Sequence, residues 1–172
     1  MAGTSLSSDD VSKLLSDSSP EIRAETAAKI ATDFSRADLS DSERTLAEEI
    51  FRLMVKDAEV RVREALALNL KENPSLPHDV AMAMAADVDS VSLPMLRYSE
   101  VLTDEDLIKI VHSQGVSKQV AIAERETVSE SVSDALVETK DENVVSTLVG
   151  NEGAEISDIT MGKAIEELGD RE

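Results

Sequence analysis

Apolar residues recur along the chain at three- and four-residue intervals, the spacing that places them on one side of a helix. The clearest case is segment 19–34, and segment 57–72 repeats its pattern: a polar start, an apolar residue followed by Arg, and then Ala and larger apolar side chains. The offset of 38 residues lies in the range of stacked helix pairs. Aligned without a gap, the matched positions are Ile22 with Val60, Arg23 with Arg61, Ala27 with Ala65, and Ile30 with Leu68.

Fainter copies of this pattern continue toward the C-terminus, each beginning after a polar turn. Ser40 and Thr103 stand where a side-chain oxygen would cap a helix start, and the three carboxylates after Thr103 suit the positive end of a helix dipole. Gly115, Gly150 and Gly153 stand where helices should end. The further predicted helices are 42–56, 78–86, 89–98, 104–112, 117–124, 131–138, 141–149 and 159–168.

The composition agrees with an all-helical fold. The 172 residues include only three aromatic side chains, 6 Gly and 4 Pro, which supplies little for the strands and tight turns of a β-sandwich or barrel. Ala, Leu, Val, Ile and Met provide the apolar positions instead. The length suits one domain with a buried core. We therefore predict an all-α domain of about ten or eleven helices.

The run from Asp57 to Ala67 resembles the second helix of a HEAT-type repeat, in which an acidic residue opens the turn, Val and Arg follow, and Ala-Leu packs against the next helix pair. Longer stretches between 46 and 157 resemble an uncharacterised bacterial family of HEAT-like repeat proteins, and the resemblance covers about 14–157. It implies a right-handed α-α superhelix, a solenoid of about five helix pairs, and no known reaction. Because Ser92 and Ala121 stand where the repeat would have Arg, we expect an Arg–Asp ladder only through the second unit.

The two ends of the chain differ in pattern. We assign 1–172 to a single HEAT-like repeat domain, with 1–18 as an N-terminal cap whose apolar residues lie among Ser and Asp. Segment 154–172 is a C-terminal capping helix or the start of a further repeat, and its free face would be solvated, covered by a second copy or continued by more repeats. Its many acidic residues favour a solvated cap, so we expect a monomer rather than a homodimer.

Charge narrows the choice of partners. Lys+Arg 17 against Asp+Glu 36 leaves a net charge of −19, which repels phosphate backbones and anionic lipids and so excludes nucleic acid and membrane surfaces. Segment 1–75 has a net charge of −5 and segment 76–172 one of −14. The acidic surface either keeps the protein soluble or docks a basic partner. No apolar segment approaches the roughly 18 residues that span a bilayer, and the absence of Cys and of a signal-peptide pattern favours the cytoplasm.

A search for catalytic and metal motifs is negative. The sequence contains no Gly-rich phosphate loop, dinucleotide fingerprint, His-Glu-x-x-His helix or nucleophile elbow. Segments 87–98 and 141–152 begin like calcium loops but lack the required Gly and ligands, so both are interpreted as acidic helix starts. His78 is expected in the first turn of a helix and His112 near the end of another, with neither in a ligand spacing. We predict no catalytic residues, no metal and no cofactor.

The expected function is a non-catalytic protein-interaction or scaffold module that uses the concave face of the solenoid. Alternatives are a regulatory module with a small ligand in the solenoid groove, and an enzyme of unfamiliar type. Raised carboxylate pKa values in a cleft would favour the enzyme, and converging polar groups in a pocket would favour the ligand. Arginine and tyrosine dominate many interfaces, so the predicted contact residues are Arg61, Arg63, Arg97, Tyr98 and Arg125.

Overall fold

The computed structural model describes residues 11–12, 16, 19–36 and 38–169, and over these residues the chain forms ten helices and no strand. The all-α prediction is confirmed, and the helices lie within a few residues of the segments expected from the apolar pattern. The helices are α2 (Pro20–Phe34), α3 (Asp41–Met54), α4 (Val60–Leu70), α5 (His78–Ala85), α6 (Asp89–Tyr98), α7 (Asp104–Ser113), α8 (Val116–Ala123), α9 (Glu130–Glu138), α10 (Glu142–Val149) and α11 (Asp158–Gly169).

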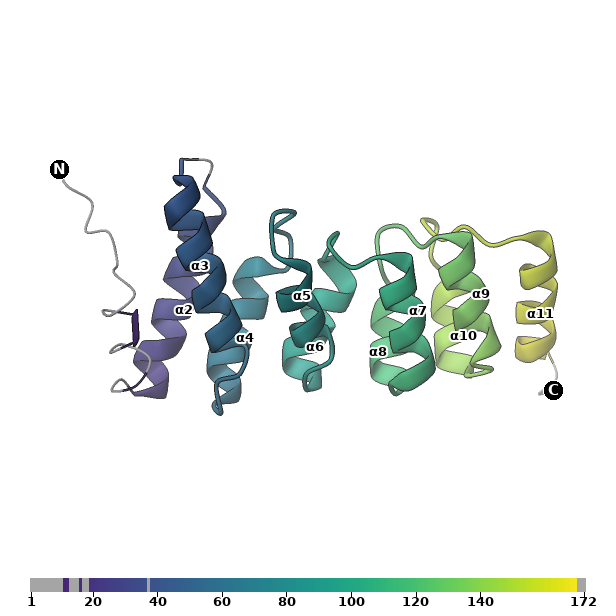
Figure 1. The fold of residues 1–172 in the computed structure, drawn as a ribbon. Coiled ribbons are helices and arrows are strands. Elements are labelled where there is room, and N and C mark those ends of the chain that lie inside the picture. The colour runs from purple at the N-terminus through teal and green to yellow at the C-terminus, as the bar shows by residue number, and fades with distance from the viewer. Residues whose placement is uncertain (1–10, 13–15, 17–18, 37, 170–172) are drawn as a thin grey trace.

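The helices form an elongated array in two layers (Figure 1). We call α2, α4, α6, α8 and α10 the even layer and α3, α5, α7, α9 and α11 the odd layer. The even layer is continuous, because each of its helices packs against the next one along the chain. In the odd layer the close contacts between neighbours join α7 to α9 and α9 to α11. The even helices therefore lie side by side from α2 to α10.

Helix starts follow the capping signals in the sequence. Ser40 and Thr103 each accept a hydrogen bond from the backbone N–H three residues on, and Glu43 and Asp106 bond back to the two cap residues. Asp141 caps α10 by accepting from two backbone N–H groups of its first turn. The expected starts near 40 and 103 are confirmed, and the calcium-like segment at 141 is a capped helix start.

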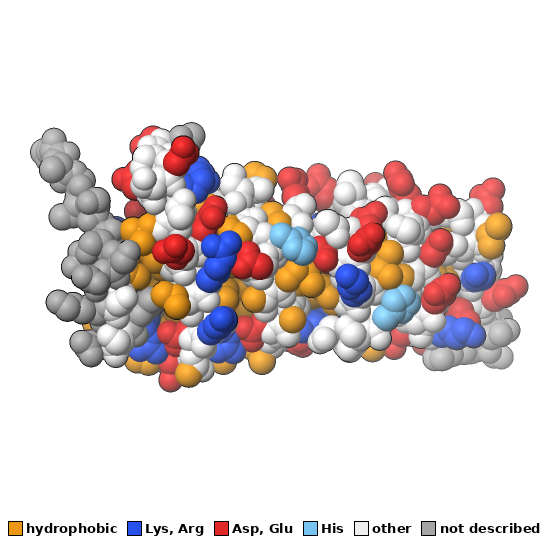
Figure 2. All heavy atoms as spheres, viewed as in Figure 1, with side chains coloured by type: hydrophobic (Ala, Val, Ile, Leu, Met, Phe, Trp, Pro, Cys, Tyr) orange, Lys and Arg blue, Asp and Glu red, His pale blue; other side chains and the backbone are white. Residues whose placement is uncertain are grey.

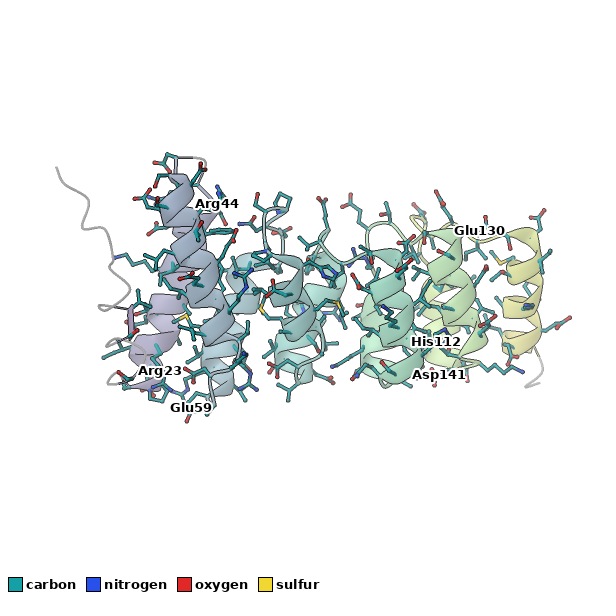
Figure 3. The ribbon with its side chains drawn as sticks, viewed as in Figure 1. Arg23, Arg44, Glu59, His112, Glu130 and Asp141 are labelled. Carbon is teal, nitrogen blue, oxygen red and sulfur yellow. The ribbon has the colours of Figure 1, made fainter. Side chains whose placement is uncertain are left out.

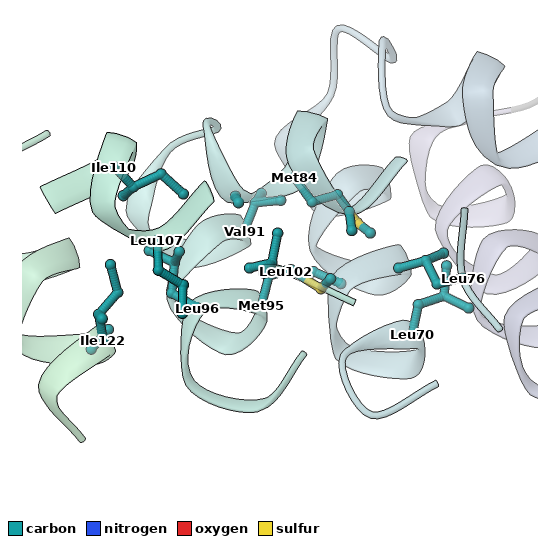
Figure 4. Close-up of a cluster of buried hydrophobic side chains, with 14 of the residues drawn as sticks. Leu70, Leu76, Met84, Val91, Met95, Leu96, Leu102, Leu107, Ile110 and Ile122 are labelled. Carbon is teal, nitrogen blue, oxygen red and sulfur yellow. The ribbon is translucent and has the colours of Figure 1, made fainter. Parts of the chain in front are cut away.

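The buried stripes correct the alignment of the first two helices. The α2 stripe includes Ile30, Ala31 and Phe34, and the α4 stripe includes Leu66, Ala67 and Leu70. These positions match at an offset of 36 residues, so the predicted offset of 38 is wrong. Two residues of the predicted α4 stripe, Val60 and Leu68, are exposed instead. Figure 4 shows Leu70 within the apolar row that continues through α6 to α8.

The alignment failed because it was anchored on arginine. Arg23 binds Asp57 in the turn before α4, whereas its matched residue Arg61 lies on the surface. The residue that repeats the role of Arg23 is Arg63, which binds Asp87 in the turn before α6. Arg61 matches Arg23 at an offset of 38 and Arg63 matches it at 40, so neither arginine marks the 36-residue offset of the buried stripes. The exposed apolar side chain of Leu68 supported the offset of 38.

The predicted end caps have different outcomes. Most of segment 1–18 lies outside the described residues, although Val11 is described and is buried in the core. At the other end, α11 packs against α9 and α10 through Thr160 and Ala164. Its outer side exposes Ile159 and Ile165 at 77% and 62%. The expected helix in segment 154–172 is thus present, and its role as a cap stays a prediction.

The corrected register predicts opposite outcomes for two leucines of α4. Leu66→Ala removes a fully buried side chain and should destabilise the protein by about 2–5 kcal/mol. Leu68→Ala, at a position 57% exposed, should change stability by no more than about 0.5 kcal/mol. Chemical denaturation followed by circular dichroism measures both, and a larger loss for Leu68→Ala would restore the 38-residue register.

Candidate functional site

Buried ion pairs join the first three helices of the even layer where the chain turns. Arg23 donates from Nε and Nη2 to the Asp57 carboxylate, at 2.8 and 3.1 Å. Arg63 binds Asp87 in the same two-point manner, at 2.6 and 3.0 Å, and also donates to the backbone carbonyl of Asp57 at 2.6 Å. Each carboxylate belongs to the turn that precedes the next even helix. The arginine therefore sets the position of that helix relative to its own.

From α6 to α10, the side chains that connect neighbouring even helices donate to backbone carbonyls instead of carboxylates. We call each of these side-chain contacts between even helices, including the two Arg–Asp pairs, a joint. Lys118, a buried side chain of α8, donates from Nζ to the Asp87 carbonyl at 2.6 Å. Arg125, just after α8, donates to the carbonyls of Leu96 and Ser99 at 2.5 and 2.8 Å. Asn151, just after α10, bonds two carbonyls at the end of α8 in the same way. Among the described residues the Arg–Asp ladder of the even layer thus stops after Arg63, as expected, but the joints themselves continue.

These joints shift the pKa values of their members. Burial alone would raise the pKa of Asp87, but hydrogen bonds from Arg63 and the Val88 amide, with the nearby charges of Arg63 and Lys118, lower it below its ordinary value. Burial alone would also raise the pKa of Asp57, yet that pKa lies below its ordinary value. Burial lowers the pKa of the Arg125 guanidinium, for which no described carboxylate lies within ion-pair distance. The ionised carboxylates are therefore part of the folded structure.

The structure separates the first two predicted contact residues. Arg61 points from α4 toward α2, where its guanidinium binds Glu21 at the surface. Arg63 points the other way, and its side chain is only 15% exposed because it is held by Asp87. The two side chains therefore lie on different sides of α4. Arg63 joins helices and has little surface to offer a partner.

The other three predicted residues meet around one hollow at the C-terminal ends of α6 and α8. Arg97, Tyr98 and Arg125 line a hollow of about 310 Å³ together with acidic side chains. Arg97 binds Glu124 at 2.7 Å across the two helices. Tyr98 is 49% exposed, and the Lys71 ammonium lies 4.5 Å from its ring centroid. A second hollow of about 240 Å³ shares Arg125 and Thr127 and extends toward Gly153.

Gly153 marks a close approach of two loops beside that second hollow. The Val128 amide donates to the Gly153 carbonyl, and the Glu155 amide donates to the Val128 carbonyl, at 3.1 and 2.8 Å. A Cβ atom at Gly153 would lie 1.8 Å from the Glu126 carbonyl oxygen, so no larger residue fits without movement of the loop. Sequence analysis placed this glycine at a helix end, whereas its role is to let the loops before α9 and α11 meet.

The two histidines lie on separate helices of the odd layer. His78 begins α5, as expected, and its Nε2 lies 2.7 Å from Asp106 Oδ2. Burial alone would raise the pKa of Asp106, but the bonds from His78 and Thr103 lower it. His112 lies exposed in the last turn of α7 (Figure 3). Across the described part of the chain, no group of three His, Cys, Asp or Glu side chains could hold a metal ion.

The two layers differ in charge over the second half of the chain. The odd helices α7, α9 and α11 contain nine acidic and two basic residues, a net charge of −7. The even helices α6, α8 and α10 contain two of each, a net charge of zero, and one of their cations is the buried Lys118. Figure 2 views the odd layer, where acidic side chains recur along the upper rim and toward the α11 end. The overall net charge of the chain does not reveal this difference in charge between the two layers.

The solvent side of α6, α8 and α10 therefore has few charges, namely Asp89, Arg97 and Glu142, and Ser117 donates to the Asp89 carboxylate at 2.8 Å. Its side chains are small polar groups mixed with aliphatic ones, and Arg97 and Tyr98 lie at its edge. Sequence analysis missed it, although the apolar period could have assigned each charge to a helix face. We call this surface the neutral wall, and its exposed or half-exposed members are Ser90, Leu93, Pro94, Val116, Ser117, Val120, Asn143, Ser146 and Val149.

Comparison with protein families gives one match. Residues 91–172 match the model of a family described as an uncharacterised protein conserved in bacteria (DUF2336). The matched part runs from the first turn of α6 through α11 and contains the neutral wall except Ser90, the hollow of about 240 Å³, and the larger hollow except Glu72. It supports the resemblance to an uncharacterised bacterial family over that part of the chain. Searches of curated proteins and of solved structures found no match, and no described helix is long and apolar enough to cross a membrane.

The Arg63–Asp87 joint predicts a pH dependence of stability. Because the folded pKa of Asp87 is below its unfolded value of about 3.9, the pair stabilises the fold above that pH and loses its effect as the pH falls through the folded pKa. Asp87→Asn should destabilise the protein by about 1–3 kcal/mol at pH 7. The stabilities of wild type and variant should converge as the pH falls through the folded pKa of Asp87. Denaturation curves across pH 2–7 measure this, and a gap that stays constant with pH would contradict it.

Proposed function

We propose that this protein is a non-catalytic interaction module whose protein partner binds the neutral wall of α6, α8 and α10. The observation that carries this proposal is the charge difference between the layers, zero on the wall helices against −7 on the odd helices beside them. In a chain with a net charge of −19, a surface across three adjacent helices with so few charges needs a reason. Association with a partner supplies one.

The physical reason is the cost of removing charges from water. A carboxylate buried at an interface loses its hydration and repays the loss only if it is paired well. Cores of protein interfaces are accordingly depleted in charged residues, with a polar rim around them. The neutral wall has this composition: Leu93, Val120 and Val149 offer apolar area, and Ser and Asn offer adaptable hydrogen bonds. Its acidic neighbours would form the rim.

The proposed architecture is the HEAT-like solenoid. In this view the even helices are the inner helices of about five pairs, and the neutral wall is part of the concave side of a right-handed superhelix. The continuous contacts along the even layer support it, because a stack in which each unit touches the next is the solenoid pattern. We also keep the expected monomer and cytoplasmic location as proposals, with a partner whose basic residues face the acidic odd layer.

The five predicted contact residues take different roles under this proposal. Arg97 and Tyr98, at the edge of the wall, are proposed to touch the partner, as is the exposed Arg61 on α4. Arg63 and Arg125 are proposed to act as positioning residues, because their donors are bound to groups of neighbouring turns. The neutral wall and Tyr98 then contribute more to the free energy of binding than the arginines do.

A small ligand beside Arg125 is the second candidate. The hollow of about 240 Å³ gathers Arg125, Asp104 and Glu155 over an apolar floor, the convergence of polar groups that ligand sites show. Its size would suit a ligand of a few heavy atoms with charges of both signs. A small molecule released on denaturing the natively purified protein would favour this candidate over the wall.

The test of the proposed function is a charge placed on the wall. Ser146 is exposed in the middle of the α10 solvent side, so Ser146→Arg adds a cation there without touching the core. Ser113→Arg, at an exposed position of α7 in the odd layer, is the matched control. Affinity capture from the native lysate, with mass spectrometry, compares the two variants with wild type as baits.

The proposal predicts a protein retained by the wild type and by Ser113→Arg but lost from Ser146→Arg. Circular dichroism and melting curves of the three baits should coincide, which excludes a folding effect. Equal retention by all three baits would contradict the proposal. Loss of the retained protein from the Ser113→Arg bait alone would indicate that the interface lies on the odd layer.

A further inference from the structure

A basic hollow lies at the α2–α4 end of the array, and one of its lining residues, Lys71, lies over Tyr98 at the edge of the neutral wall. Its volume is about 630 Å³, and it opens where α2 and α4 end and α3 begins. Three of its charged lining residues are basic (Arg36, Arg44 and Lys71), and one is acidic (Glu72). The lining thus has a charge of +2 in a chain whose net charge is −19. We call this the basic hollow.

Two of the three cations have no carboxylate partner among the described residues. The Arg44 guanidinium lies 5.0 Å from the Phe34 ring centroid, and the Lys71 ammonium lies over Tyr98. Only Arg36 has an ion pair, a surface contact with Asp33 at 3.6 Å. Acidic residues outnumber basic ones by more than two to one in the chain, so a hollow lined by three cations and one carboxylate departs from the overall composition.

Helix dipoles explain only part of this cluster. Arg36 and Lys71 follow the C-terminal ends of α2 and α4, where a cation is favoured. Arg44 lies in the first turns of α3, where the dipole disfavours a cation. Figure 3 shows it at the upper end of α3, far from the Arg23 joint at the lower end of α2. Its placement over Phe34, at the basic hollow, needs another cause.

The remaining lining suits a polypeptide rather than a bare ion. Leu68 is 57% exposed beside the hollow, and Pro74 adds apolar surface. Asn69 donates to the Ala65 carbonyl at 2.7 Å. Asn73 is fixed by a 3.1 Å bond to Ser35 and a 2.8 Å bond from the Ser75 amide. Each amide keeps a second N–H, and Asn69 its oxygen, that could bond a peptide backbone. An ion would use the cations alone. A peptide with carboxylates and one apolar side chain would use the whole surface.

We propose that the basic hollow binds an acidic segment of a partner protein, with carboxylates facing Arg44 and Lys71 and an apolar side chain resting on Leu68. The proposal goes beyond the neutral wall and stands without it, since the hollow is built from α2, α3 and α4. It also explains why an exposed leucine and unpaired cations occur together in an otherwise acidic chain.

Fluorescence anisotropy with a labelled Glu-rich peptide containing a central pair of Leu residues tests the proposal on the full chain. We expect saturable binding that weakens as salt rises. Arg44→Glu and Lys71→Glu should each weaken binding about fivefold or more. Lys109→Glu makes the same charge change at an exposed position of α7 and should leave binding unchanged. A peptide with Ser in place of Leu should bind more weakly than the parent peptide.

Further measurements distinguish an acidic peptide from other occupants of the basic hollow. Circular dichroism verifies that the variants fold, and Arg44→Gln and Lys71→Gln replace any variant that does not. Equal affinity for a Lys-rich peptide, or an unchanged affinity in both charge variants, would overturn the proposal. So would tighter binding of inorganic phosphate or of a short oligonucleotide at the same cations. Concentration-dependent self-association that the peptide abolishes would assign the hollow to a second copy and also overturn it.

Discussion

Each turn of the even layer depends on a polar side chain that reaches across to the next helix. A cation buried without a partner costs several kcal/mol, so Arg63 and Lys118 keep their places only while Asp87 and its carbonyl keep theirs. One aspartate turn therefore receives a cation from α4 and another from α8, on the two sides of α6. The spacing of three neighbouring even helices is set by these contacts together with the apolar row beneath them.

Because these contacts fix the spacing of the even helices, the neutral wall is suited to recognition. A surface that crosses three short helices is useful for recognition only if their relative positions are fixed, because ordering them on binding would reduce the affinity. The joints at Asp87, Arg125 and Asn151 fix them from both ends. Charge then differs by layer over the second half of the chain: nine carboxylates belong to α7, α9 and α11 and only two to α6, α8 and α10. Stability and recognition use different side chains of the same helices.

The sequence predicted the helices well and their junctions poorly. Periodic apolar residues and caps such as Ser40 and Thr103 are local signals, and they located the helices to within a few residues. The register of α4 was missed because Val60 and Leu68 are apolar yet exposed.

Contacts made between distant parts of the chain were the hardest to predict. The joints at Lys118 and Arg125 were missed because backbone carbonyls, their acceptors, leave no trace in a sequence. The basic hollow was missed because Arg44 and Lys71 belong to different helices and meet only in the fold. Of the predicted contact residues, Arg97, Tyr98 and Arg125 do gather in one place.

The central claim is that the even layer from α6 to α10 is the surface for a partner. Methyl cross-saturation NMR on the complex with the captured partner tests it most directly, because methyl groups occur on both layers. The account predicts signal loss at Leu93, Val120 and Val149 on the wall. Signal loss confined to Ile108 of α7 and Ile165 of α11, with the wall methyls unaffected, would contradict it.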